Sequence, residues 1–478
     1  MENNVSQSNL HPQFNISKEG TTDQNDDLRS FKLINDKHKK SVDQLFQIIY
    51  SNEPLQLKVV KRAIPKPRQS KVGTRQRIRK SFDISSGYSC EGFGFTIPEF
   101  YSKQPVEFES ELQKLYPPDR KINLKMLSSI LVEQLNLPSF FALPMMVSLN
   151  PLIFKTRVFE IPYSTFLNFA VPKLERATLP EKIFRIFLGN HQRDYLIQND
   201  IVPYIASLIQ THPSLTFLEQ EVSLQSSFIK CIVSRIFFEL DPEMRGRIYF
   251  YRIVNSNFCD CLVAVDKAVD VSDISDFFSY EHFYVLMSKF WEIDSEERGT
   301  ITMEQISKYD DNRIPIGLCR RLFKQLNPRH NSNALTFIDF VLFMLAVEDK
   351  SSETSFRLWF NVCDLDDDGL LSMSEIKQLY KIQKEKMKAG LLEPIKFKYI
   401  YSQIIDLFGN WFAKESYITI SSLRNTGNWE TFFNVLIDLK KFSEWDSQDP
   451  KREQVKKRKY RDMKTWDIFC EIEYARLT

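Results

Sequence analysis

The chain has 478 residues, a formal net charge of +2, and 43% hydrophobic and 13% aromatic residues. Its length fits two to four domains, and its near-neutral charge gives no indication of a nucleic-acid partner. No uninterrupted apolar run reaches about 18 residues, so no membrane span or membrane partner is expected.

The seven cysteines are scattered along the chain, and none has a zinc-ligand spacing with another cysteine or a histidine. This pattern favours reduced thiols in the cytoplasm over a disulfide framework or a zinc site. Glycine is scarce, with 13 residues, and the apolar periodicities are long, which favours helices.

Residues 1–90 are polar, mixed in charge and weakly periodic, so we predict a largely disordered tail. Within this tail, residues 58–80 carry ten basic residues and no acidic residue. Such a tract is typical of a nuclear-localisation or polyanion-binding segment, and a solvated basic linker explains it equally well. Both interpretations stay open from the sequence.

From residue 91 onward the pattern becomes helical and repetitive. The segments Phe237–Ile253 and Phe290–Ile306 agree at eight of seventeen positions without a gap. Two apolar residues five positions apart recur at spacings of 34 to 53 residues, which suits helix–loop–helix units in series. The predicted steps are Ile122–Leu127, Ile161–Phe166, Leu196–Ile201, Ile248–Ile253, Ile301–Ile306, Leu335–Phe340, Leu371–Ile376 and Ile418–Leu423.

The stretch Asp364–Glu375 (DLDDDGLLSMSE) has the spacing of a twelve-residue EF-hand calcium loop. Gly369 at position 6 permits the sharp turn, and Leu371 at position 8 is placed to pair with a partner loop, for which we predict the unit around Ile418. A solvated acidic turn before a helix is the alternative. The predicted ligands are Asp364, Asp366, Asp368, the backbone carbonyl of Leu370, Ser372 and Glu375.

Related loops have lost their ligands. In the loop at 294–305, Arg298 at position 5 repels a cation and Gln305 at position 12 cannot replace a bidentate carboxylate. The loop that begins at Asp241 has arginine at both positions, and Asn327–Asp339 keeps only its final aspartate. We therefore predict one Ca²⁺ site, of sensor-range affinity, and no tight site at 294–305.

The helices that enter the loops at Asp294 and Asp364 carry apolar stripes at helical spacing. We interpret the stripes as core faces, and a groove for a partner is the alternative. The stripes are formed by Phe283, Leu286, Met287, Phe290 and Trp291 in the first helix and by Phe356, Trp359, Phe360 and Cys363 in the second.

The sequence contains no glycine-rich phosphate loop, no G-x-S-x-G and no H-E-x-x-H motif. His212 and His282 lie among apolar residues, where a hydrogen-bonded structural histidine is favoured over a catalytic one. No catalytic residue is therefore predicted, although a fold can bring distant groups together.

Several stretches resemble the B″ regulatory subunits of protein phosphatase 2A, in the same order and with the same spacing. Together they extend from Thr96 to the end of the chain. The stretches are Thr96–Tyr101, Arg193–Leu218, Ser272–Asp294, Leu335–Ile376, Glu430–Phe442 and Trp466–Leu477.

The resemblance implies a mainly α, elongated array of EF-hand and EF-hand-like units with short β-bridges between loops, and no catalysis by this chain. It also implies docking on a HEAT-repeat scaffold subunit next to the catalytic phosphatase subunit, which is thereby directed to phosphoprotein substrates or locations. Two EF-hands of that family can bind calcium, and calcium tunes assembly. Here 364–375 matches the second site, whereas 294–305 departs from the first at positions 5 and 12.

We divide the chain into the tail 1–90, a helical lobe with degenerate units at 91–275, an EF-hand domain at 276–445, and a basic segment with a helix at 446–478. A phosphatase-targeting subunit explains the intact loop, the degenerate repeats and the missing active site together. The alternatives are a free-standing EF-hand calcium sensor or cytoskeletal adaptor, and an enzyme with accessory EF-hands. The expected location is the cytoplasm, with nuclear and cytoskeleton- or centrosome-associated addresses as alternatives.

Overall fold

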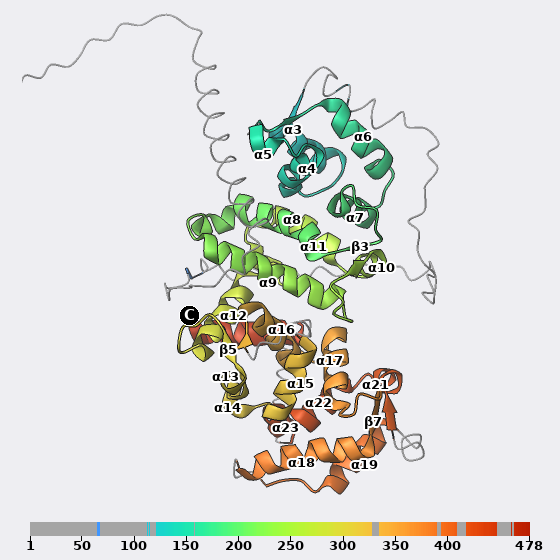
Figure 1. The fold of residues 1–478 in the computed structure, drawn as a ribbon, viewed down its shortest axis with the longest axis vertical. Coiled ribbons are helices and arrows are strands. Elements are labelled where there is room, and N and C mark those ends of the chain that lie inside the picture. Colours follow the sequence, from blue (N-terminus) through green and yellow to red (C-terminus); the bar gives the residue numbers. More distant parts are fainter. Residues whose placement is uncertain are drawn as a thin grey trace, which may run out of the picture. The chain divides into compact units, whose positions relative to one another are not determined.

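The computed structural model describes most of the chain from residue 121 onward. The tail 1–90, the basic tract 58–80 and the stretch Thr96–Tyr101 lie outside the described residues, apart from Pro65 and Lys66. Within the described part, most residues are helical and the strands are short, which confirms the mainly helical fold (Figure 1). The described residues are 65–66, 112, 114, 121–156, 158–326, 334–389, 393–408, 417–446, 460 and 463–478.

The eight predicted apolar steps begin in eight short strands, which pair two by two into antiparallel sheets. Within each sheet, the first apolar residue of one step faces the first apolar residue of the other step. All eight of these residues are fully buried. Leu371 pairs with Ile418, so the predicted partner of the calcium loop is confirmed. The other pairs are Ile122 with Ile161, Leu196 with Ile248, and Ile301 with Leu335.

The first two pairs of units precede residue 275, where we place a domain boundary as a proposal. A Thr178–Glu181 capping box starts α7, and Gly189, with a φ of 60°, ends it. The first pair contains β1 (Ile122–Asn123), α3 (Leu124–Ser129), η1 (Ile130–Gln134), η2 (Ser139–Phe141), α4 (Ala142–Leu149), α5 (Ile153–Thr156), β2 (Glu160–Ile161) and α6 (Tyr163–Leu174). The second contains α7 (Leu179–Leu188), β3 (Tyr195–Leu196), α8 (Gln198–Thr211), η3 (Pro213–Leu218), α9 (Val222–Leu240), β4 (Ile248–Tyr249), α10 (Phe250–Val254), α11 (Phe258–Lys267) and η4 (Val271–Asp273).

The third and fourth pairs follow, and three further helices come after them within the described residues. The third pair contains α12 (Tyr280–Ile293), β5 (Ile301–Thr302), α13 (Met303–Ser307), α14 (Tyr309–Asn312), α15 (Ile316–Leu326), β6 (Ala334–Leu335) and α16 (Phe337–Glu348). The fourth contains α17 (Glu353–Cys363), β7 (Leu370–Ser372), α18 (Met373–Ala389), α19 (Phe397–Phe408), β8 (Tyr417–Thr419) and α21 (Ile420–Thr426). The later helices are α22 (Trp429–Ile437), α23 (Leu439–Asp446) and α25 (Thr465–Leu477).

The apolar stripes of the entering helices α12 and α17 face the core. Phe283 and Phe290 of α12 make edge-to-face ring contacts with Phe337 of α16. Trp359 of α17 is fully buried, and its indole Nε1 donates a hydrogen bond of 2.7 Å to the carbonyl of Ala346. Because these side chains already contact neighbouring helices of the same chain, the stripes are core faces, as we interpreted them, and are not partner grooves.

The last helix, α25, packs on α12 and α16 of the third pair. Its Trp466 donates from Nε1 to Nδ1 of His282 at 3.2 Å, and Arg235 of α9 donates to the same nitrogen at 3.1 Å. His212 lies with Nε2 at 3.1 Å from the carbonyl of Val265. Both histidines are buried and hydrogen-bonded, which supports the structural interpretation.

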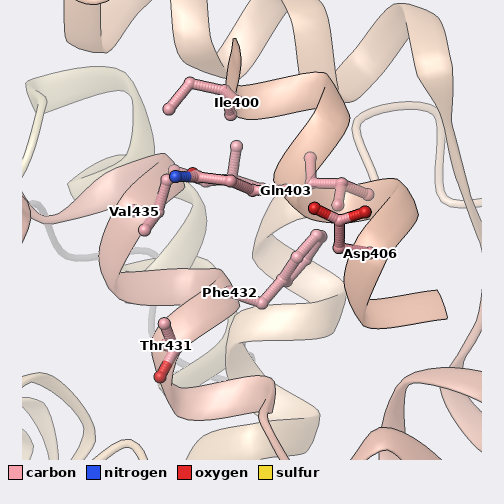
Figure 2. Close-up of a pocket in the computed structure, with 8 residues that line it drawn as sticks. Ile400, Gln403, Asp406, Thr431, Phe432 and Val435 are labelled. Carbon is pink, nitrogen blue, oxygen red and sulfur yellow. The ribbon is translucent and has the colours of Figure 1, made fainter.

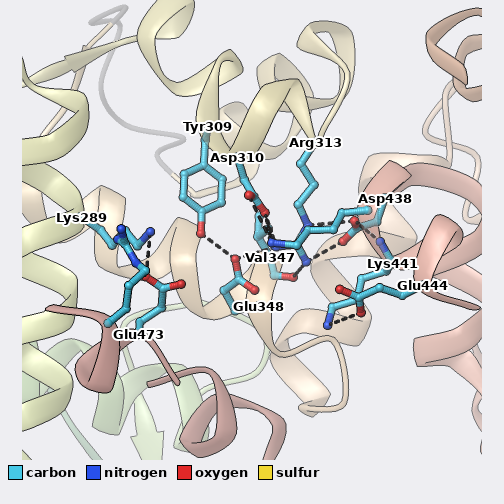
Figure 3. Close-up of polar contacts among 12 residues, drawn as sticks. Lys289, Tyr309, Asp310, Arg313, Val347, Glu348, Asp438, Lys441, Glu444 and Glu473 are labelled. Atoms are coloured by element: carbon cyan, nitrogen blue, oxygen red, sulfur yellow. Dashed lines mark hydrogen bonds and ion pairs between the residues drawn. The ribbon is translucent and has the colours of Figure 1, made fainter. Parts of the chain in front are cut away.

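A buried polar network joins the third pair to the junction of α22 and α23 (Figure 3). The guanidinium of Arg313 donates two bonds of 2.8 Å to Asp438 and one of 2.7 Å to Glu348. Lys350 adds a bond of 2.7 Å to Asp438, and Tyr309 adds one of 2.6 Å to Glu348. Burial alone would raise the pKa of Asp438, but Lys350 and Arg313 outweigh burial and hold it well below its usual range.

Candidate metal centre

The loop at 364–375 begins where α17 ends. The amide of Asp364 donates to the carbonyl of Phe360 at 2.9 Å, the last contact of the helical ladder. The Asp364 carboxylate is nearly buried and accepts bonds from the amides of Asp368 (3.1 Å) and Gly369 (2.8 Å). Gly369 has a φ of 83°, a region that favours glycine. The side chain at position 1 therefore holds the turn that bends the loop back over the helix end.

Three predicted ligands meet in this turn. Asp364, Asp366 and Asp368 offer oxygens that all lie within 4.8 Å of one another, and within the described residues this is the single such group of three acids, histidines or cysteines. Burial, the largest influence, raises the pKa of Asp364 above its usual value. Carboxylates this close repel one another unless a cation or proton compensates them. Their oxygens suit Ca²⁺, which takes oxygen ligands at about 2.3–2.6 Å.

Glu375, the predicted bidentate ligand, hydrogen-bonds to the loop. Its Oε2 accepts from the amide (2.8 Å) and the hydroxyl (2.7 Å) of Ser372, and its Oε1 accepts from the amide of Leu365. Burial alone would raise its pKa, but the bonds from Ser372 and Leu365 outweigh burial and keep the pKa below its usual value. The structure thus brings three aspartates together and leaves Glu375 and Ser372 bonded to each other at the start of α18. The six-residue ligand set stays a prediction.

The loop at 294–305 and the loop that begins at Asp241 have the same backbone turn as the calcium loop. Asp294 accepts a bond of 2.7 Å from the amide of Gly299, and Asp241 accepts one of 2.6 Å from the amide of Gly246. Both glycines have a φ of 73°, and both aspartates are nearly buried. The turn made by position 1 and position 6 therefore forms whether or not the other ligands are present.

Each degenerate loop contains its own cation. In the loop at 294–305, the guanidinium of Arg298 forms an ion pair with Glu296 at position 3. In the loop that begins at Asp241, Arg252 at position 12 forms an ion pair of 3.2 Å with Glu243 at position 3. The sequence indicated repulsion of calcium by these arginines, but not that each arginine neutralises an acid of its own loop.

Sequence reasoning also missed a contact made on the calcium loop from outside. Arg321 of α15 donates to the backbone of the loop and to the Asp367 side chain. Nothing in the sequence around Arg321 indicates this role, because α15 belongs to the third pair and the loop belongs to the fourth.

A cavity of about 290 Å³ lies between α19 and α22 (Figure 2). Its lining includes buried Ile404 and Phe432, with Gln403, Asp406 and Thr431 as its polar members. In the described part of the chain, no helix has the length and apolar character needed to cross a membrane.

Comparisons with known proteins identify the family. A family model described as "EF-hand domain" matches residues 180–268, which hold most of the second pair. The human alpha member of the B″ regulatory subunits of serine/threonine-protein phosphatase 2A is 32% identical over 287 residues, or 59% of this chain and 25% of that protein. The Arabidopsis thaliana epsilon member, described as a probable B″ regulatory protein of the same phosphatase, is 33% identical over 59% of this chain and 54% of that protein.

The match therefore spans between a quarter and about half of the length of these two relatives. A third relative, the Arabidopsis thaliana delta member of the same group, is 28% identical over 80% of this chain and 72% of its own length. A solved chain of a "PP2A PR70 Holoenzyme", whose name includes the label diCa, is 31% identical with a TM-score of 0.52. The match covers 56% of this chain and 99% of the solved chain. The chain belongs to the B″ family of protein phosphatase 2A regulatory subunits.

Proposed function

We propose that this chain acts as a regulatory subunit of a protein phosphatase 2A holoenzyme. In this role it docks on the HEAT-repeat scaffold subunit and directs the catalytic subunit to phosphoprotein substrates. The observation that carries the proposal is the 31% identity over 99% of a chain named as part of a PP2A holoenzyme. The candidate metal loop adds support, since the name of that solved chain carries the label diCa.

We further propose that the chain holds one Ca²⁺ in the loop at 364–375. The ligands are the carboxylates of Asp364, Asp366 and Asp368, the carbonyl of Leu370, Ser372 and Glu375, which together supply the oxygens that a hard cation prefers. The clustered oxygens of the three aspartates support this assignment. Calcium supplies positive charge that relieves the repulsion among these acids and fixes α17 against α18; it performs no chemical step.

The loops at 294–305 and 241–252 remain without tight calcium in this proposal. Their position-3 acids already form ion pairs with Arg298 and Arg252. The solved relative carries the label diCa, so we propose that this chain differs from it in the number of ions.

The proposal is tested by affinity purification of the tagged full chain, once with calcium and once with a chelator. Recovery of the scaffold and catalytic subunits of protein phosphatase 2A is the expected result, and the Glu375→Gln variant shows whether recovery depends on the loop. Recovery of tubulin or actin, or of no partner, would favour the free-standing calcium sensor or cytoskeletal adaptor.

The cytoplasm is the proposed location. Six cysteines among the described residues are buried and are not joined in disulfides, which agrees with a reducing compartment.

A further inference from the structure

Arg321, on α15 of the third pair, caps the end of α17 from outside the calcium loop. Its Nε donates to the carbonyl of Val362 at 2.9 Å, and its Nη2 donates to the carbonyl of Asn361 at 3.0 Å. Because α17 ends at Cys363, these carbonyls belong to its last turn, where helical acceptors lack partners. A positive charge at this end is also favoured by the helix dipole.

The same guanidinium continues into the loop. It donates to the carbonyl of Leu365 at 3.2 Å and to the carbonyl of Asp364, which are positions 2 and 1. It also forms an ion pair of 2.7 Å with Asp367 at position 4, a residue that is not a predicted ligand. Asp367 has a φ of 60°, so the ion pair holds a residue in the left-handed backbone region. Arg321 thus contacts the first third of the loop through backbone carbonyls and through Asp367, and none of these groups is a predicted ligand atom.

Two physical effects of Arg321 on calcium oppose each other. A guanidinium near a dication repels it, which lowers affinity. Groups behind the ligands also hold them in place, and removal of such groups commonly costs about 10- to 100-fold in metal affinity. Here the charge of Arg321 is compensated by Asp367, whereas its backbone bonds fix the segment that bears Asp364 and Asp366. The positioning effect should therefore exceed the repulsion.

We propose that Arg321 is the positioning residue of the calcium loop, through which α15 of the third pair orders the metal site of the fourth. The proposal rests on calcium binding at 364–375, as proposed above. By linkage, calcium binding strengthens the attachment of α15 to the loop by the same factor by which Arg321 strengthens calcium binding. Calcium bound in the fourth pair thereby stabilises the position of α15 in the third pair. The third pair's own loop at 294–305 has an arginine at position 5.

The test compares Arg321→Met with Arg320→Met in the full chain by calorimetric calcium titration. Arg320 is the exposed neighbour on the same helix, so both variants lose one positive charge of the same helix turn. We expect calcium binding to weaken about 10- to 100-fold in Arg321→Met and to stay within about twofold of the parent in Arg320→Met. Equal or tighter binding by Arg321→Met would overturn the proposal, because repulsion would then dominate.

Arg321→Lys separates charge from geometry and replaces Arg321→Met should that variant unfold. Lysine keeps the charge but cannot reproduce the planar fork, so calcium affinity should fall between that of the parent and that of Arg321→Met. Binding equal to that of the parent would show that charge alone suffices and would contradict the positioning role.

Amide hydrogen exchange in chelator supplies a readout without calcium. The amides of Asp368 and Gly369, which bond to Asp364, should exchange about tenfold faster in Arg321→Met than in Arg320→Met. Unchanged exchange would overturn the positioning role. If the parent binds no calcium, the metal assignment fails, whereas this measurement still decides whether Arg321 orders the loop.

Discussion

The loops at 294–305 and 364–375 have the same backbone turn and opposite charges at their centres. In both, a nearly buried aspartate at position 1 accepts the amide of a glycine at position 6, and the residue at position 8 enters a two-stranded sheet. One loop then gathers three carboxylates, while the other pairs Arg298 with Glu296. Positions 1, 6 and 8 are therefore shared by both loops, and the same turn forms with either set of side chains at positions 3 and 5.

The reason lies in what each part of the loop contacts. The residue at position 8 and the apolar residue five positions later are almost fully buried in both loops, as Ile301 with Ile306 and Leu371 with Ile376. Burial of such a side chain stabilises the fold by about 1.5–3 kcal/mol. The side chains at the other ligand positions are more exposed than these apolar residues, except at position 1 and at Glu375. The exposed ligand residues can therefore change without loss of the fold.

Removal of the acid at position 12 should have the largest effect on the difference between the two loops. Glu375→Gln leaves a loop that resembles 294–305 at its last position, and we expect high-affinity calcium binding to be lost because an amide cannot replace a bidentate carboxylate. Calorimetric titration of the full chain measures the effect. A variant that binds calcium as the parent does would refute the ligand assignment.

Restoration of the missing acids in the loop at 294–305 should create a second calcium site. Arg298→Asp combined with Gln305→Glu removes the internal ion pair and supplies acids at positions 5 and 12 on a backbone that already turns correctly. We expect calcium stoichiometry to rise from one to two ions per chain, with a new dissociation constant of about 10⁻⁵ M or lower. A stoichiometry that stays at one would show that the shared backbone is not sufficient for a site.

Rupture of the buried network should destabilise the chain with or without calcium. Asp438→Asn leaves Arg313 and Lys350 buried beside a neutral partner, so we expect a loss of about 3–5 kcal/mol in the free energy of unfolding at pH 7. Asp310→Asn is the matched control, since Asp310 is a more exposed acid of the same network and should cost about 0–1 kcal/mol. Denaturant unfolding in calcium and in chelator measures both variants, and equal costs would contradict the central place of Asp438.

The stability difference between the parent and Asp438→Asn should also depend on pH. The pKa of Asp438 is held below its usual range in the folded chain, so its contribution is complete above the unfolded pKa of about 4 and is lost as pH falls through the lower folded pKa. The difference in unfolding free energy between the two proteins should therefore shrink below about pH 4. A difference that does not depend on pH would show that Asp438 acts through packing instead of charge.

The smallest effect is expected at the loop that begins at Asp241. Arg252→Met removes the internal cation, but the ion pair with Glu243 is partly exposed, so unfolding should become easier by only about 0.2–1 kcal/mol. Calcium binding should not appear, because Arg245 remains at position 5. Thermal unfolding measures the first effect and calorimetry the second; a gain of calcium binding would mean that Arg252 alone excludes the ion.

Much of the architecture could be predicted because its signals are local. The step from Leu371 to Ile376 and its repeats depend on spacing within one unit, and each repeat was found in a strand and the helix after it. The pairing of Leu371 with Ile418 was predicted because EF-hand loops usually pair through the residue at position 8. In contrast, the ion pair between Arg252 and Glu243 depends on side-chain direction across the loop, which spacing does not fix.

The amino-acid sequence alone was sufficient to predict the helix–loop–helix units and the loop whose acids have calcium-ligand spacing, because these features depend on residues close along the chain. The partner of the calcium loop was predicted from the pairing habit of EF-hands, and the other three strand pairings came from the structure. Two features could be seen in the folded chain alone. Arg321 of the third pair contacts the calcium loop of the fourth pair, and Arg313, Lys350 and Asp438 meet in one buried network. Such contacts join residues more than 40 positions apart, and the packing of helices, not the local pattern, sets which charged side chains face one another.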